Sequence, residues 1–81
     1  MSAYDDIVAQ VYQGLRPFAR NDVALSEDSE LVGDLGLDSV QVMEMLLEIE
    51  DRFGISIPVN ILAEVVTIRD LASQIERLTR E

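Results

Sequence analysis

The chain is organised around residues 33–40, which read Gly33-Asp34-Leu35-Gly36-Leu37-Asp38-Ser39-Val40. This stretch is a short, glycine-punctuated loop that ends at a serine on the first turn of a predicted helix. Asp38 is a favoured N-cap residue, and Gln41 three positions later makes a capping-box variant with it. The hydroxyl of Ser39 then points outward at the positive end of the helix dipole, where a phosphate on the serine would be favoured. Serine is also common near helix starts, so this stretch alone leaves a purely structural role open.

The residues that follow Ser39 predict a helix with two apolar stripes. The helix runs from Ser39 to about Arg52, and Gly54 ends it as a C′ glycine. At about 100° per residue, the stripe that faces the core consists of Val42, Met45, Leu46, Ile49 and Phe53. The second stripe lies on the opposite side and consists of Val40, Met43 and Leu47, with the acids Glu44, Glu48, Glu50 and Asp51 around it.

Two interpretations of the second stripe stay open at this point. It packs against a neighbouring short helix or leaves a few apolar side chains exposed, which needs no functional explanation. Alternatively it is a docking surface, where a partner's apolar pocket takes Val40, Met43 or Leu47 and its Arg or Lys rim meets the carboxylates.

The first part of the chain predicts one more long helix. It begins near Ser2 or Ala3, with acids in its first turn. Pro17 ends it at about Arg16, with Phe18 packing beside the proline.

The remaining segments predict a long loop, a short helix and a last long helix. Residues 19–37 form an ordered connection that Leu25, Leu31 and Leu35 pin to the core. Pro58 suits the first turn of a short helix through about Glu64, and the last helix starts at Thr67-Ile68-Arg69-Asp70 and runs to about Thr79. The predicted fold is all-α: a small four-helix bundle of three main helices and one short helix, with a long loop between helices one and two.

Length and composition limit the partners of this chain. Its 81 residues, 48% of them hydrophobic, make a single domain, residues 1–81, with one small core. The formal net charge is −10, from 16 acidic and 6 basic residues, which disfavours nucleic acid and anionic membranes and favours basic protein surfaces. The N-terminal residues lack the basic and apolar regions of a signal peptide, and no apolar run is long enough to cross a membrane. We therefore expect a cytoplasmic monomer without membrane insertion.

The residue types that are missing argue against an enzyme. The chain has no cysteine and no histidine, so the commonest general base and the commonest metal ligands are absent. A small hydrolase with Ser39 as nucleophile would lack both a histidine base and an oxyanion pocket. We predict no catalytic residue and no metal site.

From Leu31 to Leu78, and more loosely throughout, the chain resembles the acyl carrier protein family. The matching residues are Asp34-Leu35-Gly36-Leu37-Asp38-Ser39-Val40, then Met45-Leu46-Leu47-Glu48-Ile49-Glu50-Asp51-Arg52-Phe53-Gly54-Ile55-Ser56-Ile57-Pro58, then Thr67-Ile68-Arg69-Asp70-Leu71. A lone Asp-Ser pair carries no weight, but these three runs at the family's spacing are specific.

The resemblance implies a carrier that catalyses nothing itself. Ser39 would receive a covalent 4′-phosphopantetheine group from coenzyme A through a separate, magnesium-dependent phosphopantetheinyl transferase. Asp38 would be the adjoining acid as well as the cap, and Glu44, Glu50 and Asp51 fall on positions that usually face partners. A cargo-loading ligase or acyltransferase would load the arm with a thioester. Downstream synthase or transferase enzymes of a fatty acid, polyketide or related pathway would then use it.

Two departures from the family pattern indicate a specialised free-standing carrier. Gln41 occupies a position that is often acidic in carriers of fatty acid synthesis, and Val59-Asn60-Ile61-Leu62 replaces an acidic run. An aminoacyl or peptidyl carrier of a specialised pathway therefore remains an alternative to an acyl carrier. From another class, an unmodified acidic helical adaptor that docks through Val40, Met43 and Leu47 also remains open.

Overall fold

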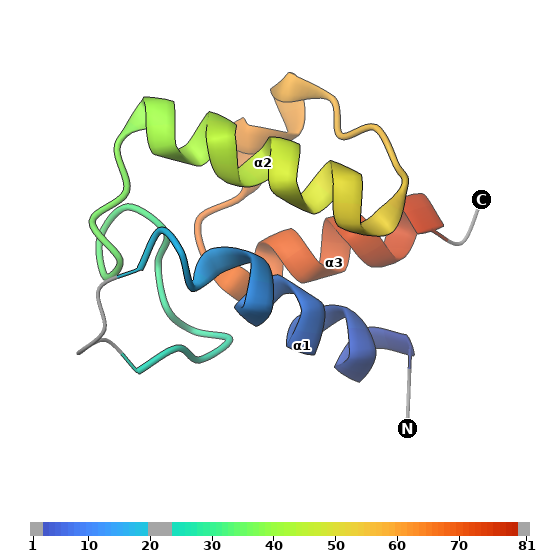
Figure 1. The fold of residues 1–81 in the computed structure, drawn as a ribbon, viewed down its shortest axis with the longest axis horizontal. Helices are drawn as coiled ribbons and strands as arrows, with labels where there is room; N and C mark the ends of the chain where they lie inside the picture. Colours follow the sequence, from blue (N-terminus) through green and yellow to red (C-terminus); the bar gives the residue numbers. More distant parts are fainter. Residues whose placement is uncertain (1–2, 20–23, 80–81) are drawn as a thin grey trace.

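The computed structural model describes residues 3–19 and 24–79 of the chain. Within these ranges there is no strand, and the elements are α1 (Ala3–Leu15), α2 (Ser39–Phe53), the 3-10 helix η1 (Val59–Glu64) and α3 (Ile68–Thr79). Figure 1 shows α2 lying above α1 and α3, with the described residues that precede α2 at the end of the molecule where α2 begins. The predicted all-α bundle is confirmed. None of the described helices is long and apolar enough to cross a membrane.

Helix α1 ends where the proline predicts. Its last residue is Leu15, one residue before the predicted end, and the N–H groups of Phe18 and Ala19 both donate to the Leu15 carbonyl at 2.9 Å. These bonds replace the helical ladder that Pro17 cannot continue. The possible start at Ser2 lies outside the described residues.

Helix α2 ends at the predicted glycine. Gly54 has the left-handed conformation (φ 64°, ψ 37°) that glycine adopts without a Cβ penalty, and its N–H donates to the Glu50 carbonyl at 2.8 Å. The inner face follows the predicted stripe, since Met45, Leu46 and Ile49 are buried and the other two members, Val42 and Phe53, pack partly buried against the same core.

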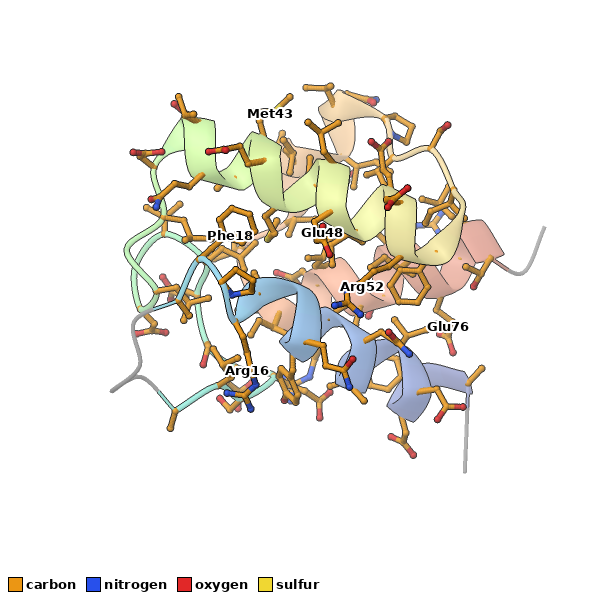
Figure 2. The ribbon with its side chains drawn as sticks, in the orientation of Figure 1. Arg16, Phe18, Met43, Glu48, Arg52 and Glu76 are labelled. Atoms are coloured by element: carbon orange, nitrogen blue, oxygen red, sulfur yellow. The ribbon has the colours of Figure 1, made fainter. Side chains whose placement is uncertain are left out.

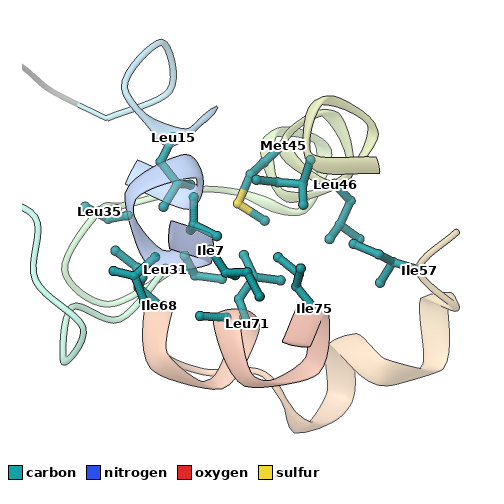
Figure 3. Close-up of a cluster of buried hydrophobic side chains, with 14 of the residues drawn as sticks. Ile7, Leu15, Leu31, Leu35, Met45, Leu46, Ile57, Ile68, Leu71 and Ile75 are labelled. Carbon is teal, nitrogen blue, oxygen red and sulfur yellow. The ribbon is translucent and has the colours of Figure 1, made fainter. Parts of the chain in front are cut away.

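The core lies between the three α-helices. Its fully enclosed side chains come from every α-helix and from the loop before α2, as Figure 3 shows for the labelled residues. They are Val11, Leu15, Leu37, Met45, Ile49, Ile68, Leu71 and Ile75. Burying one leucine or isoleucine side chain contributes about 1.5–3 kcal/mol, so this shared core stabilises the packing of α2 against α1 and α3.

The start of α3 is capped from both directions. The Asp70 carboxylate accepts hydrogen bonds from the N–H groups of Val66 and Thr67 at 3.0 Å, and the Asp70 N–H donates to the Thr67 hydroxyl at 3.1 Å. This reciprocal pairing is a capping box, and it confirms the predicted start at Thr67.

The long loop is fastened to the start of α3 by backbone hydrogen bonds. Leu31 donates to the Val66 carbonyl, Ile68 donates to the Ser29 carbonyl, and Arg69 donates to the Glu27 carbonyl, all at 2.9–3.0 Å. Within the described part of the loop, Leu31 and Leu35 are buried and Leu25 packs partly buried against the core, as the sequence predicts. This fastening fixes the approach of the chain to α2.

The short helix differs in type from a regular α-helix. Pro58 stands before it in an extended conformation (φ −61°, ψ 136°) rather than in its first turn, and the six residues that follow form a 3-10 helix with no buried side chain. The predicted end at Glu64 is confirmed. Such short 3-10 segments commonly connect longer helices.

Candidate functional site

Ser39 is the first residue of α2 and is exposed. Asp38 adopts the extended conformation of an N-cap (φ −90°, ψ 178°), and its Oδ1 accepts from the Gln41 N–H at 2.8 Å. The Gln41 side chain returns a bond from its Oε1 to the Asp38 N–H at 3.2 Å. Among the described residues, none forms a hydrogen bond with the Ser39 hydroxyl. The capped turn therefore presents a free hydroxyl at the positive end of the helix dipole.

Beside the first turn of α2 lies an apolar pocket of about 270 Å³. Its walls come from the loop before α2, from α2 itself, and from η1 and the segment after it: Glu30, Leu31, Val32, Gly33, Val42, Leu62, Val65 and Val66. Val42 is three residues from Ser39, so the pocket wall and the hydroxyl belong to neighbouring positions on one side of the helix. Glu30 contributes the one carboxylate of this lining.

The second apolar stripe of α2 is exposed. Val40 is 65% exposed, Met43 41% and Leu47 64%. These three side chains are therefore not buried against η1 in the isolated chain.

The acids of α2 fall into two groups. Glu44, Glu48 and Asp51 line an open hollow of about 470 Å³ together with Leu47 and Phe18; Figure 2 shows Phe18 and Glu48 on the edge of α2 that faces α1. Glu50 differs from these three acids. It is half-buried, and its Oε2 accepts from the Ile57 N–H at 2.7 Å, so this carboxylate secures the turn after α2.

Phe18 is the residue of this hollow that sequence reasoning missed. The sequence placed it beside Pro17 as a packing residue, and the structure does show it partly buried against the core. An aromatic side chain directly after a helix-ending proline was the available signal, but nothing in the sequence brings it to α2.

The perturbed pKa values lie away from Ser39, at the anchors of the long loop. Burial and a hydrogen bond from its hydroxyl to Glu27 Oε1, at 2.5 Å, raise the pKa of Tyr4 to about 12. The backbone N–H groups of Thr67 and Val66 lower the pKa of Asp70. Arg69 adds ion pairs with Asp28 and, at 3.8 Å, with Glu27.

The residue types around Ser39 limit what the site can do chemically. The chain has no histidine or cysteine. Within residues 3–19 and 24–79, no three carboxylates gather in a way that could hold a metal ion. The arrangement offers an acceptor hydroxyl, an adjacent apolar pocket and an acidic surface, which together suit attachment and presentation of a group.

The sequence is similar to one protein family and to several proteins that share one name. Residues 18–75 match the protein family described as "Phosphopantetheine attachment site". The chain is 32% identical over 76 residues to a protein of Helicobacter pylori named "Acyl carrier protein", covering 94% of both chains. It is 34% identical over 76 residues to the protein of the same name in Wolinella succinogenes, covering 94% of this chain and 96% of the relative. The Campylobacter hominis protein of that name is 37% identical over 57 residues, covering 70% of this chain and 72% of the relative.

Proposed function

The chain belongs to the acyl carrier proteins of the phosphopantetheine-attachment family, and on that premise we propose that Ser39 bears the 4′-phosphopantetheine. As a member of this family it is not an enzyme but an acyl carrier of fatty acid or related biosynthesis, with a covalent phosphopantetheine arm. The residue that holds the arm is the part that we assign.

One observation carries the assignment of Ser39. Its exposed hydroxyl stands, without a partner among the described residues, at a capped helix N-terminus inside the matched segment 18–75. The negative charge of a phosphodiester is stabilised at the N-terminal end of a helix dipole. Asp38 stabilises the first turn of α2 by capping it, and its carboxylate lies next to Ser39 in the chain.

Attachment needs a separate transferase. In the transfer, the Ser39 oxygen forms a bond to phosphorus, the diphosphate linkage of coenzyme A breaks, and the nucleotide leaves. The hydroxyl proton passes to a general base in the complex of carrier and transferase.

The apolar pocket supports an acyl cargo. Seven of its eight lining residues are valine, leucine or glycine, and an apolar chain gains about 0.8 kcal/mol for each buried methylene group. A thioester on an arm from Ser39 would have this pocket beside it. We favour acyl over aminoacyl cargo for this reason.

The partners are the transferase, a cargo-loading ligase or acyltransferase, and the synthase or transferase enzymes that use the cargo. The exposed side of α2 supports docking by such enzymes, since Val40 follows Ser39, Met43 lies about one turn further on, and the acids Glu44, Glu48 and Asp51 line a hollow with Leu47. A net charge of −10 opposes self-association. We propose a single-domain monomer that works in the cytoplasm.

The attachment is tested by incubating the apo protein with coenzyme A, Mg²⁺ and a broad-specificity phosphopantetheinyl transferase. The intact mass should rise by one phosphopantetheine arm, and Ser39→Ala should stay at its original mass. A wild-type protein that gains nothing would favour the unmodified adaptor, and a gain that persists in Ser39→Ala would place the arm elsewhere.

Docking is tested by reversing charge on α2. Glu44→Lys combined with Asp51→Lys should slow cargo transfer and reduce its dependence on salt, while the melting temperature stays near that of the wild type. The matched control is Glu64→Lys with Glu76→Lys, which changes net charge equally on η1 and α3. Equal transfer rates in both double variants would remove the assignment to α2.

A further inference from the structure

We propose that Glu30 is a specificity-determining residue of the apolar pocket, and that it selects acyl cargo with a hydroxyl or amino group along the chain over cargo that ends in a carboxylate. The inference rests on the carrier function proposed above and adds a substrate class to it. Glu30 contributes the single carboxylate among eight lining residues, so polar recognition of cargo by the side chains of this lining falls to Glu30.

The backbone of Glu30 is held in place on both sides. Its N–H donates to Asp34 Oδ2 at 2.7 Å, and its carbonyl accepts from the N–H groups of Asp34 and Leu35 at 3.0 Å. The next residue, Leu31, donates its N–H to the Val66 carbonyl at 3.0 Å, and both of these residues line the pocket. These bonds fix the point from which the Glu30 side chain leaves the loop.

A glycine makes room for the Glu30 carboxylate. A Cβ added at Gly33 would lie 2.5 Å from Glu30 Oε1 and 3.4 Å from Glu30 Cδ, so the carboxylate lies directly against the Gly33 backbone. Both residues line the pocket. Gly33 is not among the glycines with a positive φ, so its backbone conformation does not itself require glycine. The missing side chain instead provides the space that the carboxylate fills.

The Glu30 carboxylate has no partner within the described part of the chain. The backbone N–H of Glu30 bonds to Asp34, but neither carboxylate oxygen accepts a hydrogen bond or pairs with an arginine there. Two other acids of the long loop differ, because Glu27 and Asp28 both pair with Arg69. Glu30 therefore keeps its full accepting capacity for a group that enters the pocket.

A carboxylate at an apolar wall discriminates between cargoes by their polarity. A hydroxyl or ammonium group on the cargo can donate to Glu30, and hydrogen bonds to charged acceptors are stronger than those between neutral groups. A carboxylate on the cargo would meet the like charge of Glu30 and give up hydration to the apolar walls, which opposes its entry. An unsubstituted acyl chain depends on the apolar walls alone.

The pocket is tied to the chain on both sides of the attachment point. Val42 lines it three residues after Ser39. The N–H of Leu37, two residues before Ser39, donates to the carbonyl of the lining residue Leu31 at 3.1 Å. Cargo on an arm from Ser39 can therefore fold back into this pocket and meet Glu30.

The test compares acyl groups in the pocket of the loaded carrier. Apo protein is loaded at Ser39 from coenzyme A thioesters of octanoate and of octanoates with a hydroxyl beside the thioester, at mid-chain or at the chain end. Octanoates with an amino or a carboxyl group at the chain end complete the set. Intact mass verifies the loading, and the ¹³C-methyl shifts of Val42, Leu62 and Val65 report the fraction of cargo inside the pocket.

The expected result is a preference that depends on Glu30. For the best-placed hydroxyl, the ratio of inserted hydroxyoctanoyl to inserted octanoyl should be about fivefold larger in the wild type than in Glu30→Gln, as expected for a hydrogen bond to a solvent-screened charge. A larger effect with the amino group would identify an amine as the donor, and a larger effect with a hydroxyl would identify an alcohol. The chain that ends in a carboxylate should enter Glu30→Gln more than the wild type.

Two further variants separate the position of the carboxylate from net charge. In Gly33→Ala, the new Cβ displaces Glu30 Oε1 while the net charge stays at −10, so selectivity should fall as it does in Glu30→Gln. Glu64→Gln is the matched control, because Glu64 is an exposed acid of η1 outside the lining, and this variant should select as the wild type does. If Gly33→Ala fails to fold, Glu30→Gln, at an exposed position, carries the test.

Two results would overturn the proposal. Equal cargo ratios in the wild type and Glu30→Gln would assign selection to the apolar walls alone, and an equal loss in Glu64→Gln would assign it to net charge. A failure of the proposed function looks different, because no cargo would then load at Ser39. In that case pantetheine amides of the same acids are titrated into the unmodified protein, and the comparison of wild type with Glu30→Gln decides the role of Glu30.

Discussion

Removing the cap of α2 gives the sharpest stability prediction of this structure. Asp38→Ala deletes the carboxylate that accepts the Gln41 N–H at 2.8 Å and also frees the Gln41 side chain from its return bond. Replacing a capping Asp by Ala reduces the free energy of unfolding by about 1 kcal/mol, within a range of about 0.5–2. For a domain of this size, such a loss lowers the melting temperature by about 4–8 °C.

Two companion variants separate the cap from its charge. Asp38→Asn keeps an equally good capping side chain but removes the carboxylate, so its melting temperature should lie close to the wild-type value. Gln41→Ala removes only the exposed 3.2 Å return bond and should cost about 0.5 kcal/mol. If the carboxylate of Asp38 also serves attachment, Asp38→Asn should be modified at Ser39 more slowly despite its unchanged stability.

The assay is thermal and urea unfolding followed by circular dichroism, with the rate of modification measured by intact mass. Two results would contradict the role of the cap: a melting temperature of Asp38→Ala equal to that of the wild type, or a loss of stability in Asp38→Asn as large as that in Asp38→Ala. Either result would mean that the capping box does not hold the first turn of α2.

Three other predictions concern pH and backbone conformation. Because the pKa of Tyr4 is raised to about 12, its contribution to the free energy of unfolding is fully present below the unfolded pKa of 10.0 and is lost as the pH rises toward 12. In urea titrations, the free energy of unfolding of Tyr4→Phe should therefore fall less between these pH values than that of the wild type. An identical fall in both proteins would contradict this role of Tyr4. The lowered pKa of Asp70 has the opposite sign, since its stabilisation is present above the unfolded value of 3.8 and is lost as the pH falls below it, so Asp70→Asn should flatten the acid limb of the same curve. An unchanged acid limb would count against the cap of α3. Gly54→Ala adds a Cβ to a residue in the left-handed conformation (φ 64°), and no other atom lies within 4 Å of that Cβ. Backbone strain alone should therefore lower the free energy of unfolding by about 1–2 kcal/mol. A melting temperature equal to that of the wild type would contradict this strain.

The features that the sequence predicted well are those with local physical causes. Asp38 and Gln41 are close in the chain, so their reciprocal capping depends on little else. The end of α2 at Gly54 and of α1 before Pro17 also follow from single residues with special backbone preferences. The buried stripe of α2 followed from helical periodicity alone.

The features that the sequence did not predict depend on contacts between distant segments. Phe18 joins the hollow on α2 only because α1 packs beside that helix. Glu50 looked like one more surface acid until the turn after α2 brought the Ile57 N–H to its carboxylate. The pairing of Leu31 with Val66 likewise joins two loop segments whose spacing carries no periodic signal.

The surroundings of the second stripe of α2 also depend on contacts between distant segments. Periodicity placed Val40, Met43 and Leu47 on one outward side, and all three are exposed. One edge of that side carries the acids and the other adjoins the apolar pocket. This arrangement depends on the segments that pack beside α2. The structure separates the two, with the acidic hollow toward Phe18 and the pocket toward η1.

The intact mass of the protein isolated from its native host tests whether Ser39 holds the arm. We predict an intact mass that exceeds the chain by one phosphopantetheine arm and a thioester-bound acyl group, which hydroxylamine should release. Fragmentation should place the arm on Ser39. An unmodified mass, or an arm on any other residue, would rule out Ser39 as the attachment site.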